Sequence, residues 1–191
     1  FGSAATVSIK ASAAGYTDGS TTVTVTNVDA PPAAGDPTVV INKYLNNAPA
    51  GQPDYIELLV INNGVAGTTL DMRGMIVKDF SASMGSDGGG KFTFTENSVF
   101  EKVKTGTLIV LAADADSSDT DGSDFSLRLG LKDSGYFTEV PGFDISTTEM
   151  IMIKAKDSGT AGVVGGIHAL AAGIAGALFD DTVCAKVRAD L

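Results

Sequence analysis

The chain is poor in the residues that carry most catalytic and metal chemistry. Its 191 residues include one Cys, one His and no Trp. A single Cys excludes a disulfide within the chain, and one Cys with one His excludes a zinc cluster of the Cys/His type. We therefore expect stability to come from packing, from ions held by oxygen ligands, or from neighbouring subunits.

Positive charge is also scarce. The chain has 13 basic against 23 acidic residues, for a formal net charge of −10, and the basic residues are scattered along it. Nucleic-acid binding needs a positive surface that displaces counterions from phosphates, so we expect no nucleic-acid partner. An acidic surface favours solubility and the binding of cations.

Long hydrophobic runs are absent as well. The longest uncharged stretch runs from Gly159 to Phe179, and it consists mostly of Gly and Ala. So weakly hydrophobic a segment gains little from lipid, and we expect no membrane span. The chain begins at Phe1 without a Met or a signal-like run, which is typical of a processed product or an excised segment.

What the chain has in quantity favours β-structure. It contains 23 Gly, with many Thr, Ser and Val, and 43% of its residues are hydrophobic. This composition suits short β-branched strands separated by tight turns. The length fits one large domain, or a domain of about 150 residues with an appendage.

The first 29 residues predict a β-hairpin. Apolar and polar residues alternate from Ala5 to Val28, with a Gly/Asp turn at Gly15–Ser20. The piece resembles the last hairpin of a bacterial Ig-like or Calx-β repeat. An isolated hairpin is marginally stable, so it is the remnant of a preceding domain, folds back onto the rest, or completes a sheet in a neighbouring molecule. Residues 30–37 have the Pro-rich composition of a linker.

Residues 38–165 predict a β-sandwich, because short strands recur at regular spacing. The expected strands are Val39–Asn42, Tyr55–Ile61, Met75–Phe80, Lys91–Phe94, Thr107–Leu111, Phe125–Leu129, Glu149–Lys154 and Ala161–Val164. Residues 166–191 form an Ala/Gly-rich C-terminal segment, which packs internally or at a subunit contact. Within it, Asp180 or Asp181 is a candidate cap for a short helix over Val183–Arg188.

Three segments within residues 38–165 resemble in order and spacing the lamin tail domain family: Tyr55–Leu58, the corner Leu70–Gly74, and Gly106–Leu111. The resemblance implies an immunoglobulin-like β-sandwich and a non-catalytic binding or structural role. It also implies a secreted or cell-surface protein, since the family is found as a module in such proteins of bacteria and archaea. Lys43 and Met75 depart from the family, which often has an acidic residue and Trp there.

The densest cluster of charge is an acidic loop at residues 112–124. Its candidate metal ligands are Asp114, Asp116, Asp119, Asp121 and Asp124. Calcium takes six to eight oxygen ligands from flexible loops, so calcium is one interpretation. The other is a solvated acidic connection, and the loop lacks the Glu that an EF-hand requires, because Arg128 stands there.

Other candidates carry weaker signals. The loop from Asp79 to Lys91 contains Asp87 before three glycines, and we interpret it as a flexible hairpin loop in preference to a metal or phosphate site. His168 lies between apolar residues, with no nucleophile motif nearby, so we expect a structural role. Cys184 lacks the signature of a reactive thiol. We expect no catalytic residue and no enzymatic activity. The one cofactor that the sequence suggests is calcium, in the acidic loop.

Two functions remain open at this point. The first is an extracellular structural module that mediates protein assembly, as a subunit of a surface array or filament, through strand donation and with assistance from calcium. Its partners are other copies of the chain or neighbouring domains of the same surface protein. The alternative is an accessory carbohydrate- or surface-binding module of a larger secreted enzyme, which the lack of Trp disfavours.

Overall fold

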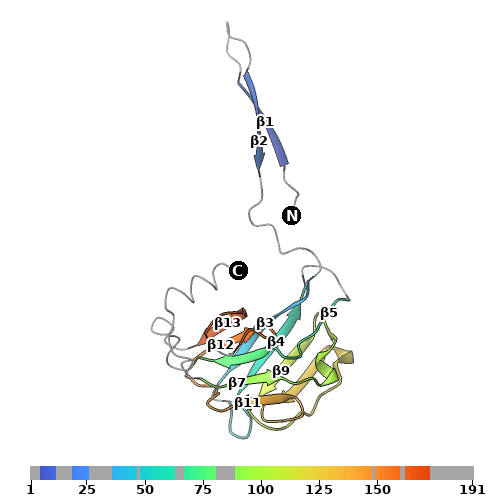
Figure 1. Ribbon diagram of the computed structural model, residues 1–191, viewed down its shortest axis with the longest axis vertical. Helices are drawn as coiled ribbons and strands as arrows, with labels where there is room; N and C mark the ends of the chain where they lie inside the picture. The colour runs from blue at the N-terminus through green and yellow to red at the C-terminus, as the bar shows by residue number, and fades with distance from the viewer. Residues whose placement is uncertain are drawn as a thin grey trace. The chain divides into compact units, whose positions relative to one another are not determined.

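A computed structural model describes residues 5–11, 19–25, 36–46, 48–62, 67–80, 89–147, 149–159 and 162–172 (Figure 1). Over these ranges the protein is all-β, with two single-turn 3-10 helices as its helical structure. The chain divides into two compact units, Phe1–Ala34 and Gly35–Leu191. In the described ranges, no helix is long and apolar enough to cross a membrane.

The N-terminal unit contains an antiparallel pair of seven-residue strands, β1 (Ala5–Ala11) and β2 (Gly19–Val25). Ser8 lies opposite Thr22 at the centre of the pair, and Val7 lies opposite Val23 beside it. The sheet has these two strands alone among the described residues. The predicted pair of strands is present, and residues 26–28, over which the alternation continues, lie outside the described residues.

The larger unit contains two main sheets. The first has the order β10-β9-β4-β3, and the second has the order β11-β7-β6-β12-β13. The strands of the first are β3 (Thr38–Leu45), β4 (Tyr55–Ile61), β9 (Leu108–Ala112) and β10 (Ser126–Gly130). Those of the second are β6 (Ile76–Asp79), β7 (Lys91–Phe94), β11 (Phe137–Val140), β12 (Glu149–Lys154) and β13 (Gly166–Ala172).

Short elements close the ends of these sheets. Strands β5 (Thr69–Leu70) and β8 (Val103–Lys104) form a two-stranded antiparallel pair. The 3-10 turns are η1 (Ser98–Phe100), capped by the side chain of Asn97, and η2 (Gly122–Asp124), capped by that of Asp121. Both caps accept a backbone N–H of their own turn, which is the local signal for starting a helical turn.

The two sheets share one hydrophobic core, which is a β-sandwich arrangement. In β4, Ile56, Leu58 and Val60 alternate with less buried residues and are fully buried. The second sheet contributes aromatic residues: the ring of Phe94 lies edge-on to those of Phe100, at 4.9 Å between centroids, and Phe137, at 5.2 Å. Edge-to-face packing of this kind stabilises a core beyond the area it buries.

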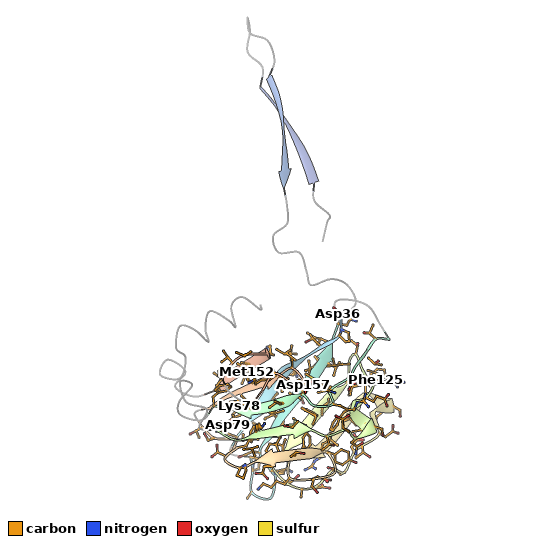
Figure 2. All side chains as sticks on the ribbon, in the orientation of Figure 1. Asp36, Lys78, Asp79, Phe125, Met152 and Asp157 are labelled. Carbon is orange, nitrogen blue, oxygen red and sulfur yellow. The ribbon has the colours of Figure 1, made fainter. Side chains whose placement is uncertain are left out.

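A second, smaller cluster lies on the other face of β6 and β12. It consists of Phe80, Met150 and Met152, with Val163 packed against it. Two lysines share this face by the alternation of the strands: Lys78 is 2% exposed and Lys154 is fully buried. The Lys154 ammonium donates to the carbonyl of Gly162 at 2.9 Å, and that of Lys78 lies 5.0 Å from the centre of the Phe80 ring. Figure 2 labels Lys78, Asp79 and Met152 on this part of the molecule.

One predicted strand is wrong. In the expected strand Ala161–Val164, residues 162–164 form a bend and a turn, and β13 begins at Gly166. Gly162 and Gly165 adopt positive φ angles of 57° and 75°, which end an extended run. The strand instead occupies the start of the segment assigned to the Ala/Gly-rich C-terminus. The predicted helix at Val183–Arg188, with Asp180, Asp181 and Cys184, lies outside the described residues, as does most of the 30–37 linker.

Candidate functional site

The acidic loop has a topological reason for its length. It connects β9 to β10, and these strands pair in parallel, with Leu108 opposite Ser126 and Ala112 opposite Gly130. Two parallel neighbours cannot be joined by a tight turn, because the chain must return to the end at which the first strand began. Residues 113–125 make this return. Strand pairing therefore accounts for a loop of this length without any ligand.

Arg128 on β10 holds the first part of the loop. Its Nη2 donates to Asp114 Oδ2 at 2.8 Å, and its Nη1 donates to Asp116 Oδ2 at 3.2 Å. Nη1 also donates to the backbone carbonyl of Asp116. Arg128 and Asp114 are each about one-third exposed, whereas Asp116 is 66% exposed. One guanidinium thus neutralises two of the five candidate ligands.

The other three carboxylates bond to nearby backbone. Asp119 accepts the N–H of Asp121 at 3.3 Å, Asp121 accepts that of Ser123 at 2.9 Å, and Asp124 accepts that of Ser126 at 3.0 Å. The hydrogen bond from Ser123 holds the pKa of Asp121 below its ordinary value, with a smaller contribution from the charge of Lys104. These are Asx turns, in which a side chain stabilises its own loop.

The five carboxylates of the loop therefore already have partners, which are Arg128 and nearby backbone N–H groups. Among the described residues, no three His, Cys, Asp or Glu side chains gather in a group that suits a metal ion. The arrangement offers no support for calcium at these five positions, and calcium binding there stays a prediction.

The loop also covers one edge of the first sheet. Arg128 and Asp119 exchange backbone hydrogen bonds, with distances of 2.8 and 3.3 Å, so the outer edge of β10 is paired at that point. The N–H of Gly130 donates to Ser117 Oγ at 3.1 Å. An incoming strand would have to displace these bonds in order to pair with β10.

His168 connects the edges of the two sheets. It lies on β13, opposite Ile153, and its Nδ1 accepts the backbone N–H of Ile41 on β3 at 3.2 Å. Strand β3 is irregular here, with a register shift between Ile41 and Lys43. Burial lowers the pKa of His168, which favours the neutral imidazole that this acceptor role requires. The observed contact is structural, in agreement with the role expected for this residue.

Strand β11 is an open sheet edge in the described structure. It pairs with β7 on one side, and Thr138, Glu139 and Val140 are exposed. Among the described residues, these three make no backbone hydrogen bonds beyond that pairing. A depression of about 250 Å³ lies beside the strand. Its lining residues are Leu131, Lys132, Ser134, Phe137, Thr138 and Glu139.

The loop from Asp79 to Lys91 begins at a buried acidic residue. Asp79 is fully buried, and its Oδ2 accepts the N–H of Asp144 at 3.1 Å. Gly89 approaches so closely that a Cβ there would lie 2.0 Å from the carbonyl oxygen of Asp79. Asp79 thus ties this loop to the segment after β11, while Asp87 lies outside the described residues.

Sequence reasoning missed Arg128, Asp79 and Lys154 as partners of neighbouring segments. Arg128 and Lys154 stand at alternating positions of predicted strands, and a lone charge within an apolar strand is a signal for a specific partner. Comparison of the chain with protein-family models, with curated proteins and with solved structures gave no match.

Proposed function

We propose that the chain is a non-catalytic structural module that assembles with other copies of itself through its N-terminal hairpin. One observation carries the proposal: β1 and β2 form a two-stranded sheet with no third strand among the described residues. A two-stranded hairpin is marginally stable by itself in water. Pairing with a sheet edge of another copy supplies a third strand and satisfies the backbone groups along one edge of the hairpin.

The state of the four sheet edges favours β11 as the acceptor. The outer edge of β10 is bonded to the acidic loop, and the edges of β3 and β13 are joined through His168. Thr138, Glu139 and Val140 of β11 are exposed and bonded on one side. Four residues of β11 pair with part of a seven-residue strand, which gives a short and reversible ladder.

Donation of a hairpin to a different surface of the next copy is a heterologous contact. Such contacts repeat in one direction, and they produce rings or open filaments. The resemblance to the lamin tail family supports an immunoglobulin-like sandwich as the repeating unit and an extracellular setting. The net charge of −10 opposes the approach of copies at low ionic strength, so assembly should strengthen as salt screens that repulsion.

A proline on the acceptor edge tests the proposal. Thr138 and Val140 direct their backbone groups at β7, so the N–H of Glu139 faces the open side of β11. Glu139→Pro removes this outward donor, at an edge position where proline is tolerated, whereas Glu139→Val keeps the donor and favours a strand. We expect light scattering to show concentration-dependent oligomers for the unmodified chain and for Glu139→Val, and monomers for Glu139→Pro. Circular dichroism should show the same β-structure in all three. Equal assembly of both variants would remove β11 as the acceptor.

A further inference from the structure

A polar cavity of about 490 Å³ opens between the first residues of η1, strand β8 and turn η2. Its size lies within the range of cavities that hold small ligands in proteins. All of its lining residues belong to the described structure of the larger unit. None of the lining residues belongs to β1, β2 or β11, the strands proposed to pair between copies.

The charged residues that line the cavity are both cationic. Lys102 and Lys104 contribute to the lining, and no Asp or Glu does, although the chain has 23 acidic and 13 basic residues. Lys104 lies on β8 and Lys102 lies in the turn that immediately precedes this strand, and both side chains line the cavity. An anionic group in the cavity therefore meets two ammonium groups.

Contacts at the rim hold Lys104 near the cavity. Its Nζ donates to the carbonyl of Ser123 at 3.4 Å and lies 5.2 Å from the centre of the Phe125 ring, which Figure 2 labels. Phe125 has a left-handed backbone, with φ of 68°, and is 48% exposed. Lys102 is exposed, and no hydrogen bond or ion pair of its ammonium is found among the described residues.

The rest of the lining offers hydrogen bonds and a modest apolar surface. Its polar side chains are those of Asn97, Ser98, Thr107, Thr120, Ser123 and Tyr136. Val99 and Leu127 add apolar contact. Hydroxyl and amide groups of this kind match a ligand that carries several hydroxyl groups, and the apolar residues match its C–H face.

Thr107 adds an independent observation. The residue is fully buried, it lines the cavity, and its hydroxyl has no hydrogen-bond partner among the described residues. A buried polar group without a partner costs free energy, and such groups are uncommon enough to call for an explanation. Because this hydroxyl is out of reach of solvent, a ligand or a bridging water supplies the missing partner after a shift of the side chains that line the cavity.

We propose that this cavity binds a sugar acid, either free or as one unit of an anionic polysaccharide. Its carboxylate pairs with Lys102 and Lys104, and its ring hydroxyls bond to the polar side chains of the lining. Tyr136 is the one aromatic residue of the lining, so charge and hydroxyl contacts, rather than stacking, carry recognition. This mode of binding needs no Trp.

Backbone amide NMR of the full chain tests the proposal at physiological salt. The probes are D-glucuronate, tetragalacturonate, glucose, acetate and inorganic phosphate. We expect both sugar acids to shift the amides of residues 102–107 and 122–123, with at least fivefold weaker binding of glucose and acetate. Tighter binding of tetragalacturonate than of glucuronate identifies a polymer as the source, and the reverse order identifies a free sugar acid.

Variants distinguish binding in the cavity from a general attraction of anions to surface lysines. Lys102→Gln and Lys104→Gln should each weaken binding of the sugar acids at least fivefold, and Thr107→Val should weaken it severalfold. Lys132→Gln is the control, because it removes an exposed lysine outside this cavity. Absence of sugar-acid binding, equal effects of Lys132→Gln and Lys102→Gln, or phosphate binding as tight as that of glucuronate would overturn the proposal.

Discussion

The imidazole of His168 accepts the backbone N–H of Ile41 at 3.2 Å, which joins an edge strand of one sheet to an edge strand of the other. Protonation converts Nδ1 into a donor, so the imidazolium cannot accept this bond. Burial lowers the pKa of His168 from its ordinary value of 6.5, and no charged group contributes to the shift. The hydrogen bond from Ile41 to His168 therefore forms only when the imidazole is neutral.

The pH dependence of stability follows from that shift. Because the folded-state pKa is lowered, the unfolded chain takes up the proton first as the pH falls. The contribution of His168 is complete above about pH 6.5 and is lost as the pH falls through the folded-state value. Between pH 7 and pH 5, urea unfolding should show a steeper loss of stability for the natural chain than for His168→Gln, which keeps an acceptor without titrating. Parallel curves would contradict this role.

The ion pair between Arg128 and Asp114 should contribute more to stability than the pair with Asp116. Both are partly screened by solvent, so each is worth about 1 kcal/mol or less. The carboxylate of Asp114 is closer and more buried than that of Asp116. Double-mutant cycles with Arg128→Met, Asp114→Asn and Asp116→Asn measure the two coupling energies in urea unfolding. A larger coupling to Asp116 would contradict the geometry.

Millimolar calcium should leave thermal stability almost unchanged. The five aspartates of the loop bond to Arg128 and to nearby backbone N–H groups, and calcium would have to displace these partners. We expect the melting temperature to rise by about 1 °C or less, with the same result for magnesium. A rise of several degrees with calcium alone, abolished by Asp121→Asn, would establish the calcium site instead.

Gly106 should resist replacement by any other residue. Its φ is 95°, a conformation that is costly for residues with a Cβ. Gly106→Ala should lower the free energy of unfolding by about 1 kcal/mol or more. Gly122→Ala is the control, because a Cβ at Gly122 makes only ordinary contact, at 3.7 Å from Leu127, and Gly122 is not among the residues with positive φ. Equal losses for the two variants would argue against backbone strain at Gly106.

The strands of the fold were predictable where apolar residues alternate strongly. Tyr55–Ile61, Lys91–Phe94 and Glu149–Lys154 have the predicted bounds. Strand β13 was misplaced because its Gly and Ala side chains give a weak alternation. Strand β11 was missed because its four residues, Phe137–Val140, lie between turns and three of them are exposed. The position of each strand is set by pairing with a neighbour: β11 pairs with β7, and β13 pairs with β12.

The candidate sites were harder to predict, because they depend on pairing between distant segments. The acidic loop was visible in the sequence, but the parallel pairing of β9 and β10, which explains its length, was not. The partnership of Arg128 with Asp114 needs that pairing. The 490 Å³ cavity combines residues from Asn97 to Tyr136, and no motif marks them. The alternation of apolar and polar residues can be seen within one short segment. The order of strands in a sheet depends on contacts between segments that are far apart in the sequence.

Light scattering of three forms of the chain tests the proposed assembly most directly. These are the full chain, a chain that starts at Gly35, where the larger unit begins, and the full chain with Val23→Pro, which removes a backbone donor from the interior of β2. Val23→Thr, which keeps the strand, is the control. We predict concentration-dependent oligomers for the full chain and for Val23→Thr, and monomers for the other two. A full chain that stays monomeric at every concentration and salt, or a shortened chain that assembles equally well, would contradict the proposal.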